Sequence, residues 1–349
     1  MAKKYLLVRT NKEKFMKISL IICTYMRPEA ICVLLDSVVS QTKIPNEIII
    51  VDGSTNTKTK EILELKDYKL NIRYFLVEPK DRGLTRQRNF GVNSVEVDMD
   101  LLAFLDDDIR LEKEYFEELT KPYLQDKTVV GVGGCTTNEI QWYPFTEGMV
   151  CTKKIFCMDG FFRNESLRYR MRKLFNLVPS TQPGIKSKYS HERPVAFLPP
   201  SGKHYEVDFM MGGIASFKQS LFKEISFSHY FEGYGLYEDK DFTLRASKIG
   251  KLIVNTDAKL EHLHDPNGRP NKFYYGKMVI RNGWYVWRVA CDTPGIKGIL
   301  QWYSNALLLI AIRFTNIITG PNRIEALTET SGRIYGLLTL LVSKPRENK

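Results

Sequence analysis

Short apolar runs alternate with amphipathic stretches between residues 17 and 134, and this alternation constrains the fold more than any other feature. ISLIICT (18–24) and EIIIVD (47–52) are β-branched runs typical of strands buried on both faces. Behind Pro28, apolar residues recur at helical spacing as far as Val39. Alternation of this kind predicts an α/β fold, a mostly parallel sheet with helices on both faces.

The same reading extends to the rest of the chain. Further strands are expected at NIRYFLVE (71–78), DLLAFLD (100–106) and TVVGVGG (128–134). Helices are expected after the turn GSTN (53–56) through Leu65, and at residues 83–95 and 111–124. Residues 135–205 are aromatic, basic and irregular, with one plausible helix in 161–175. We expect a strand or hairpin with a short helix in 208–225, a helix after Tyr237, one or two strands in 251–265, and helices from 266 onward.

Polar side chains follow three of the expected strands at the point where each ends: Thr24, Asp52, and the run Asp106, Asp107 and Asp108. Ligands of parallel sheets bind at the carboxyl ends of the strands. Three adjacent carboxylates repel one another, and Mg²⁺ or Mn²⁺ favours such oxygen ligands, so we expect a metal site here. The alternatives are a helix cap for one of the three aspartates and a local turn for Asp52.

Two further groups could carry chemistry. Arg82, Arg86 and Arg88 surround an expected helix start and suit phosphate, although at least one should lie on a solvated face. Glu238, Asp239 and Asp241 could supply a general base, or could complement a helix dipole. His262 and His264 could ligate a metal, or one of them could be a core side chain.

The net charge of +11 suits an anionic partner such as a nucleotide, a nucleic acid or an acidic membrane surface. No pair among the six cysteines has redox or zinc spacing, so we expect reduced thiols in a cytoplasmic protein. The N-terminus lacks the pattern of a secretory signal. The run ALLLIAI (306–312) is too short to span a bilayer, so the basic, aromatic C-terminal region could lie on the cytoplasmic face of a membrane or form core helices.

Taken in order along the chain, six segments resemble the family 2 glycosyltransferases of the Rossmann-like GT-A fold, including those of bacterial cell-surface glycan synthesis. The segments are ISLIICTYMRPEAICVLLDSVVSQ, EIIIVDGST, GLTRQRNFG, AFLDDDI, MMGGIASFKQSLF and YEDKDFTLRASKIG. The resemblance covers residues 17 to about 265. It implies a basic extension (1–16), a GT-A domain (17–265) with a nucleotide-binding half (17–134) and an acceptor half (135–265), and a C-terminal helical region (266–349).

The resemblance also implies an inverting transfer from a UDP-, dTDP- or GDP-linked sugar to a glycan or lipid-linked acceptor, with Mn²⁺ or Mg²⁺. Asp108, Asp106 and His262 would meet the metal. Asp239 would be the catalytic base, with Glu238 as the alternative. The residues implied on the nucleotide-sugar side are Thr24, Tyr25, Arg27, Asp52, Arg82, Arg88, Asp106, Asp107 and Gly213. Independently of the resemblance, residues two apart on an extended chain point to the same face, so Asp106 and Asp108 could face one ligand and Asp107 is the one most expected to face elsewhere.

Two departures from the family's pattern refine this interpretation. VDGS carries one aspartate, so Asp52 alone would contact the base, and IRNGW (280–284) only loosely resembles the Gln-x-x-Arg-Trp motif. Without a run of transmembrane helices, we expect a single-addition transferase. A sugar-phosphate nucleotidyltransferase would need a glycine-rich loop, and CTYMRPE has none. A non-catalytic basic nucleotide- or membrane-binding protein is a further alternative, whereas no nucleic-acid-binding module is recognisable.

Overall fold

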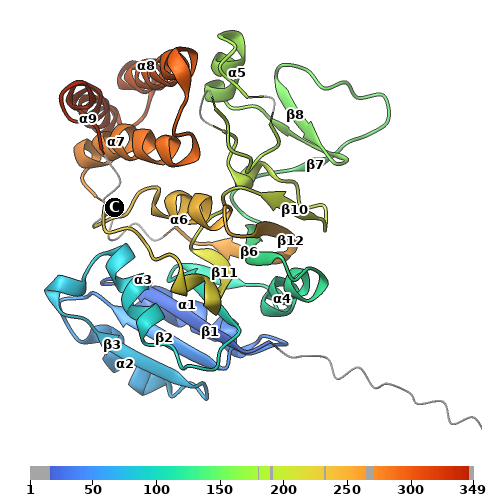
Figure 1. Cartoon of the computed structure of the whole chain (residues 1–349), viewed down its shortest axis with the longest axis vertical. Coiled ribbons are helices and arrows are strands. Elements are labelled where there is room, and N and C mark those ends of the chain that lie inside the picture. Colours follow the sequence, from blue (N-terminus) through green and yellow to red (C-terminus); the bar gives the residue numbers. More distant parts are fainter. Residues whose placement is uncertain (1–15, 180, 189–191, 232, 265–269, 346–349) are drawn as a thin grey trace, which may run out of the picture.

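The structure is a computed structural model that describes residues 16–179, 181–188, 192–231, 233–264 and 270–345. The expected basic extension therefore lies, apart from Met16, outside the described residues. Figure 1 shows a central twisted sheet with helices packed around it, a small separate sheet at one corner, and three C-terminal helices stacked together on one side.

Between residues 18 and 136, strands and helices alternate as the sequence predicts, apart from two consecutive strands within 101–111. The strands are β1 (Ile18–Thr24), β2 (Glu47–Asp52), β3 (Ile72–Leu76), β4 (Leu101–Asp106), β5 (Ile109–Leu111) and β6 (Val129–Thr136). The helices are α1 (Pro28–Val39), α2 (Lys58–Lys66), α3 (Leu84–Asn93) and α4 (Tyr115–Gln125), with a 3₁₀ turn at Pro79–Asp81. Pro28 begins α1, where the missing N–H of proline costs no helical hydrogen bond.

Strands β3, β2, β1 and β4 are neighbours and run parallel. The register pairs Thr24 with Asp52 and Cys23 with Asp106, so these strand ends share one edge of the sheet. The sheet continues through β11 (Ile214–Lys218), which is antiparallel to both neighbours, and then through β6, β12 (Lys251–His262) and β10 (His204–Val207). The predicted α/β architecture, mostly parallel in its first half, is confirmed.

The core has two layers because successive strand residues point to opposite faces. On one face, Leu20 packs in a cluster with residues of α1 and α4. On the other face, Ile21 packs in a cluster that includes Phe242 of α6 (Glu238–Ala246). Helices therefore cover both faces of the sheet, as expected.

The region 137–205 holds more structure than the sequence predicts. The expected helix is α5 (Leu167–Leu174), but a small antiparallel sheet of β7 (Tyr143–Pro144), β9 (Phe161–Asn164) and β8 (Ile155–Met158) was not foreseen. 3₁₀ turns occur at Val195–Phe197 and Gln219–Lys223. A disulfide joins Cys151 to Cys157, so the expectation of six reduced thiols is wrong. That expectation considered only redox and zinc spacings, and missed a short loop that brings the two Cα atoms to 6.1 Å.

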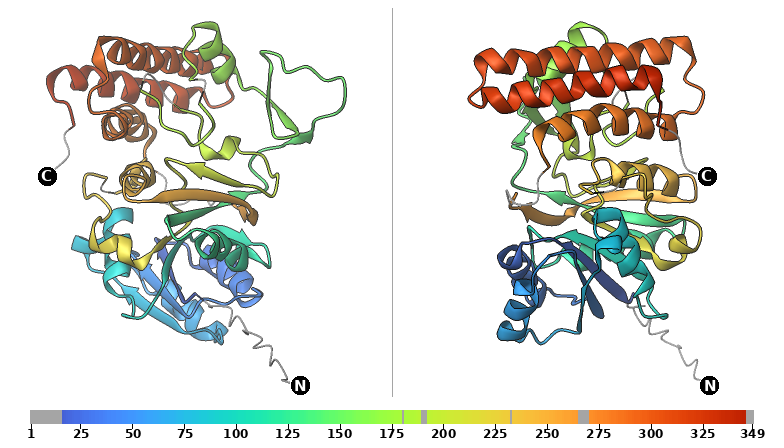
Figure 2. Two further views of the ribbon diagram at one scale, coloured as in Figure 1. Left: turned by 45° about the vertical axis from the view of Figure 1, so that its right-hand side comes forward. Right: turned by 90° about the vertical axis from the view of Figure 1, so that its left-hand side faces the viewer.

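The C-terminal helices are α7 (Lys272–Ala290), α8 (Gly295–Thr319) and α9 (Arg323–Val342), and α8 and α9 lie side by side along the face of the molecule farthest from β1–β3 (Figure 2). Among the described residues, α8 alone is long and apolar enough to cross a membrane by length and composition. Its most apolar window is 28% buried within the protein. The expectation that this apolar run is too short to span is thus corrected, because the run is part of a continuous 25-residue helix.

Candidate functional site

A cavity of about 650 Å³ opens at the carboxyl edge of β1 and β4. Its walls come from the ends of those strands, the start of α3, the loop before α6 and the end of β12. The lining residues are Cys23, Thr24, Tyr25, Arg27, Arg82, Gly83, Leu84, Gln87, Asp106, Asp107, Asp108, Gly233, Tyr234, His262, His264 and Pro270. Nine of the residues singled out from the sequence therefore meet here, from Thr24 to His264, 240 positions apart.

All three adjacent aspartates line this cavity, although Asp107 was expected to face elsewhere. β4 ends at Asp106, and the next two residues form a turn, so the side chains no longer alternate as they do on a strand. Asp107 accepts hydrogen bonds from Thr24 Oγ1 at 2.6 Å and Arg27 Nη1 at 2.9 Å. Burial nevertheless raises the pKa of Asp107 to about 6.

Asp106 is the most accessible of the three, with a side chain 42% exposed. Its oxygen Oδ1 lies 3.4 Å from Nη2 of the buried Arg88, and its backbone N–H donates to the carbonyl oxygen of Gly213 at 2.9 Å. A Cβ at residue 213 would overlap the Asp106 carboxyl group, so only glycine permits this approach. Arg88 and Gly213 therefore do not line the cavity but support Asp106 from behind.

The two candidate bases lie in this supporting layer, at the start of α6. Glu238 is buried and forms an ion pair with Arg88, and burial raises the pKa of Glu238 although Arg88 opposes the shift. Asp239 accepts from the backbone N–H groups of Lys240 (2.7 Å) and Gly212 (3.4 Å), and burial raises its pKa too. Neither residue lines the cavity: Glu238 is joined to Arg88, and the Asp239 carboxylate lies against the Gly212 backbone.

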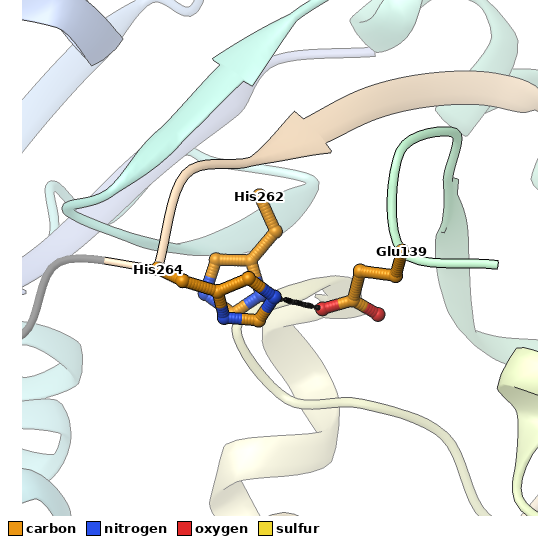
Figure 3. A group of neighbouring side chains, drawn as sticks. All are labelled: Glu139, His262 and His264. Atoms are coloured by element: carbon orange, nitrogen blue, oxygen red, sulfur yellow. Dashed lines mark hydrogen bonds and ion pairs between the residues drawn. The ribbon is translucent and has the colours of Figure 1, made fainter. Parts of the chain in front are cut away.

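His262, at the end of β12, lies beside the aspartates, because β12 pairs with β5 at this point and the Leu263 N–H donates to the Asp108 carbonyl oxygen at 2.8 Å. Its Nε2 lies 3.1 Å from Asp108 Oδ1, and its Nδ1 lies 2.9 Å from Glu139 Oε1. These two hydrogen bonds raise the pKa of His262 to about 10. His264 also contacts Glu139, and Figure 3 shows both rings beside that carboxylate.

The donor atoms of Asp106, Asp108 and His262 lie within 4.8 Å of one another. Two carboxylates and an imidazole form an oxygen-rich set that suits Mn²⁺ well. Repulsion between the two carboxylates is a further reason why a cation fits. The residues present thus fit a divalent metal.

Of the remaining residues predicted from the sequence, some line the cavity and one does not. Tyr25 and Arg82 line the cavity, and Arg82 Nη2 donates to the carbonyl oxygen of Ser54 at 3.3 Å. Asp52 is fully buried and does not line it. The Asp52 carboxylate accepts from the Ser54 N–H at 2.7 Å and the Tyr74 hydroxyl at 2.8 Å, which is the turn left open as its alternative role.

Two residues that sequence reasoning missed make specific hydrogen bonds at the site. Gln87 Nε2 donates to the carbonyl oxygens of Thr24 (3.0 Å) and Val51 (2.8 Å), and so ties α3 to the ends of β1 and β2. Glu139 follows β6 at the same edge of the sheet. The rule that marked the other strand ends would have marked Glu139 as well, had it been applied to β6.

The chain is similar to known proteins over most of this fold. The sequence model of Glycosyl transferase family 2 matches residues 19–225. Glycosyltransferase GlyA of Streptococcus pneumoniae is 30% identical over 132 residues, which are 38% of this chain and 17% of that protein. The hyaluronan synthase of Pasteurella multocida is 25% identical over 263 residues, 73% of this chain and 25% of that protein. This chain thus spans a quarter or less of either relative.

Among solved structures, a crystal structure of GalNAc-T7 with UDP, GalNAc and Mn²⁺ superposes with a TM-score of 0.50. It is 16% identical, and the match covers 79% of this chain and 49% of that one. At this identity the likeness shows the fold alone. The family model, by contrast, matches more than half of the sequence, and it includes the strands that carry Thr24 and Asp106. The chain belongs to glycosyl transferase family 2.

Proposed function

We propose that this protein is an inverting, metal-dependent glycosyltransferase that moves a sugar from a nucleoside-diphosphate sugar to an acceptor hydroxyl. The observation that carries the proposal is the convergence of Asp106, Asp107, Asp108 and His262 on one cavity at the carboxyl edge of the sheet. A volume of about 650 Å³ suits a nucleotide sugar. Family membership supports the reaction class, and the UDP and Mn²⁺ named for the GalNAc-T7 structure support the type of donor and ion.

The donor would lie along the ends of β1 and β4. Arg27 and Arg82 line the cavity and offer guanidinium groups to a diphosphate. Thr24 and Arg27 hold Asp107, which keeps this wall of the cavity in one shape. Tyr25 presents an exposed ring that could cover the nucleoside. Asp52 would act indirectly, through the turn at Ser54.

Asp106, Asp108 and His262 would hold Mn²⁺ or Mg²⁺. When bound, such a cation neutralises charge on a departing diphosphate. Arg88 is buried behind Asp106, and its positive charge contributes in the same direction. Asp106 and Arg88 together would thus fix the sugar-bearing end of the donor.

Asp239 is the better candidate for the base. The Glu238 carboxylate is already committed to the Arg88 ion pair. Burial raises the pKa of Asp239, which makes it a stronger proton acceptor. In a single displacement, the acceptor oxygen would bond to the anomeric carbon, the bond to the diphosphate would break, and the hydroxyl proton would pass to Asp239. One displacement inverts the configuration.

Family membership argues against the sugar-phosphate nucleotidyltransferase and the non-catalytic binding protein as alternatives. We further propose that residues 17–265 form the catalytic domain, with nucleotide-binding and acceptor halves that meet near residue 135. Single addition, rather than processive synthesis, stays our prediction. A cytoplasmic location and a role in cell-surface glycan synthesis, with a glycan or lipid-linked acceptor, are part of the same proposal.

The test is a thermal-shift screen of UDP, dTDP and GDP with and without Mn²⁺. We expect one diphosphate to raise the melting temperature, and only when Mn²⁺ is present. Asp108→Ala should remove the metal-dependent shift, whereas Asp239→Asn should keep it and lose transfer. Full transfer activity in either variant would exclude the role assigned to that residue. Lys69→Ala, at an exposed pair far from the cavity, serves as the control.

We also propose that α8 and α9 rest on an anionic bilayer surface. Large apolar side chains are exposed along both helices: Leu300, Leu307, Phe314 and Ile318 on α8, and Ile324, Leu327, Ile334, Leu338 and Leu341 on α9. α8 has no acidic residue, and the chain carries a net charge of +11. These properties favour an anionic lipid surface as the partner of this face.

The measurement is co-sedimentation with anionic and neutral vesicles at low and high salt. We expect binding to anionic vesicles at low salt, and its loss in the Leu307→Glu/Phe314→Glu variant. A protein that ignores anionic vesicles at low salt would contradict the proposal.

A further inference from the structure

The segment after β6 docks onto the end of β12 and sets the surroundings of His262. The Asn138 side chain forms two hydrogen bonds with the backbone of His262. Its Nδ2 donates to the His262 carbonyl oxygen at 2.9 Å, and its Oδ1 accepts from the His262 N–H at 3.0 Å. The Thr137 N–H donates to the carbonyl oxygen of Leu260 at 2.8 Å. These bonds place the next residue, Glu139, beside the imidazole ring.

The His262 ring lies between two carboxylates. Nδ1 is 2.9 Å from Glu139 Oε1, and Nε2 is 3.1 Å from Asp108 Oδ1 (Figure 3 shows the Glu139 side). A histidine that donates Nδ1–H to a carboxylate has its other nitrogen free to bind a cation, and the partner fixes both the tautomer and the ring orientation. In this geometry the Nε2 atom of His262 faces the part of the cavity that is lined by Asp106 and Asp108.

Glu139 is itself held in place. Its Oε2 accepts from Thr136 Oγ1 at 3.2 Å, and its Oε1 also lies 3.1 Å from His264 Nε2. Its side chain is 20% exposed, and the His262 and His264 rings lie 4.1 Å apart between centroids. Three partners on one carboxylate leave it little freedom to turn away from the ring.

We propose that Glu139 is a positioning residue that orients His262, so that Nε2 faces the divalent cation of the proposed site. This inference rests on the proposed metal-dependent function. The donor atoms of Glu139, His262 and His264 also lie within 4.8 Å of one another. A second ion there would take Nδ1, and one imidazole would then bridge two cations, which requires removal of both ring protons. An orienting carboxylate needs no such step.

The experiment measures Mn²⁺ binding to the metal-free protein by calorimetry at one fixed pH. Glu139→Ala should weaken Mn²⁺ affinity by about 10- to 100-fold, the usual effect of losing a carboxylate that orients a ligand histidine. Glu139→Gln should lose much less, because the amide oxygen still accepts from Nδ1–H. Glu261→Gln is the matched control: this neighbouring glutamate pairs with Arg110 at 3.2 Å, outside the cavity, and its loss should not change affinity.

Pulsed electron paramagnetic resonance of bound Mn²⁺ supplies a readout that a structural role would not move. The wild type should show ¹⁴N coupling from an imidazole ligand, and Glu139→Ala should lose it while thermal unfolding of the metal-free protein stays near wild type. If that variant does not fold, Glu139→Asp, which withdraws the carboxylate from Nδ1, carries the same expectation.

Unchanged affinity and unchanged ¹⁴N coupling in Glu139→Ala would overturn this proposal and leave the function standing. Two Mn²⁺ ions per wild-type chain, one of them lost entirely in Glu139→Ala, would overturn it in favour of a second ion site. No Mn²⁺ binding by the wild type would overturn both this proposal and metal dependence.

Discussion

Gly213→Ala tests whether the close approach of Gly213 to Asp106 fixes the position of that carboxylate. A methyl carbon at residue 213 would lie 2.1 Å from Asp106 Oδ2. Carbon and oxygen atoms in contact need about 3.3 Å, so the carboxylate has to withdraw by roughly 1.2 Å. The backbone at Gly213 is outside the left-handed region, so alanine adds no backbone strain and the clash is the whole perturbation.

The expected effect on stability is small and the effect on function is large. The Asp106 side chain is 42% exposed and can turn outward, so the loss of unfolding free energy should be about 1 kcal/mol, the low end for overpacking. A displacement of about 1 Å in a group that positions the substrate costs on the order of 10²-fold in rate. That factor corresponds to about 2.7 kcal/mol of transition-state stabilisation.

The assay is kcat/KM with the nucleotide sugar selected by the thermal-shift screen, in excess Mn²⁺, alongside urea unfolding. Gly283→Ala is the control, since its new methyl group would meet only Tyr237 at 3.7 Å. Asp106→Ala should be as impaired alone as in combination with Gly213→Ala, because the glycine acts only through that carboxylate. Near-wild-type kcat/KM in Gly213→Ala, or additive losses in the double variant, would refute the reasoning.

Three further predictions concern a helix contact, the disulfide and a surface carboxylate, all outside the candidate site. Gly332→Leu should lower the free energy of unfolding by about 3 kcal/mol, because even a Cβ there would overlap the α7 backbone; urea unfolding like that of the wild type would contradict this close contact. In denaturant without reductant, four of the six cysteines should react with a thiol reagent, and all six after reduction of Cys151–Cys157; six at the outset would disprove the bond. Hydrogen bonds led by the Thr128 hydroxyl lower the pKa of Asp126 to about 2, below its unfolded value of 3.8. The charge-dependent stability that Asp126→Ala removes should therefore be present at pH 6 and be lost as the pH falls from about 4 through 2, whereas an equal loss at pH 6 and below pH 2 in thermal unfolding would contradict this.

The parallel half of the fold could be predicted because its signals are local. A strand buried on both faces needs a continuous apolar run, and a helix that covers it needs apolar residues at helical spacing; ISLIICT and the residues after Pro28 meet those needs by themselves. The antiparallel insertion of β11 between β4 and β6 has no such local mark. It depends on pairing between segments about 80 to 120 residues apart, which a single sequence does not encode as a pattern.

The candidate site was also predictable only in part: the sequence indicated where its residues lie but not where their side chains point. The rule that ligands bind at strand ends brought Thr24 and the aspartates to one edge, and the register of β1 with β2 and β4 agrees. The direction of each side chain could not be predicted. Alternation along a strand suggested that Asp107 faces away from Asp106 and Asp108, but β4 stops at Asp106 and the turn brings all three carboxylates to the cavity.

Hydrogen-bond partners explain the contrast between Asp52 and Asp107, two buried acidic residues that the family resemblance assigned to the nucleotide. A buried carboxylate needs partners, and both residues have them. Asp52 takes its hydrogen bonds from Ser54 and Tyr74, neither of which lines the cavity, and the bond from Ser54 holds the turn that follows β2. Asp107 takes them from Thr24 and Arg27, on the cavity wall. The partners therefore decide which acid would respond to a bound anion: under the proposed function, a diphosphate that attracts Arg27 would compete with Asp107, whereas the Ser54 N–H and the Tyr74 hydroxyl that hold Asp52 lie outside the cavity lining.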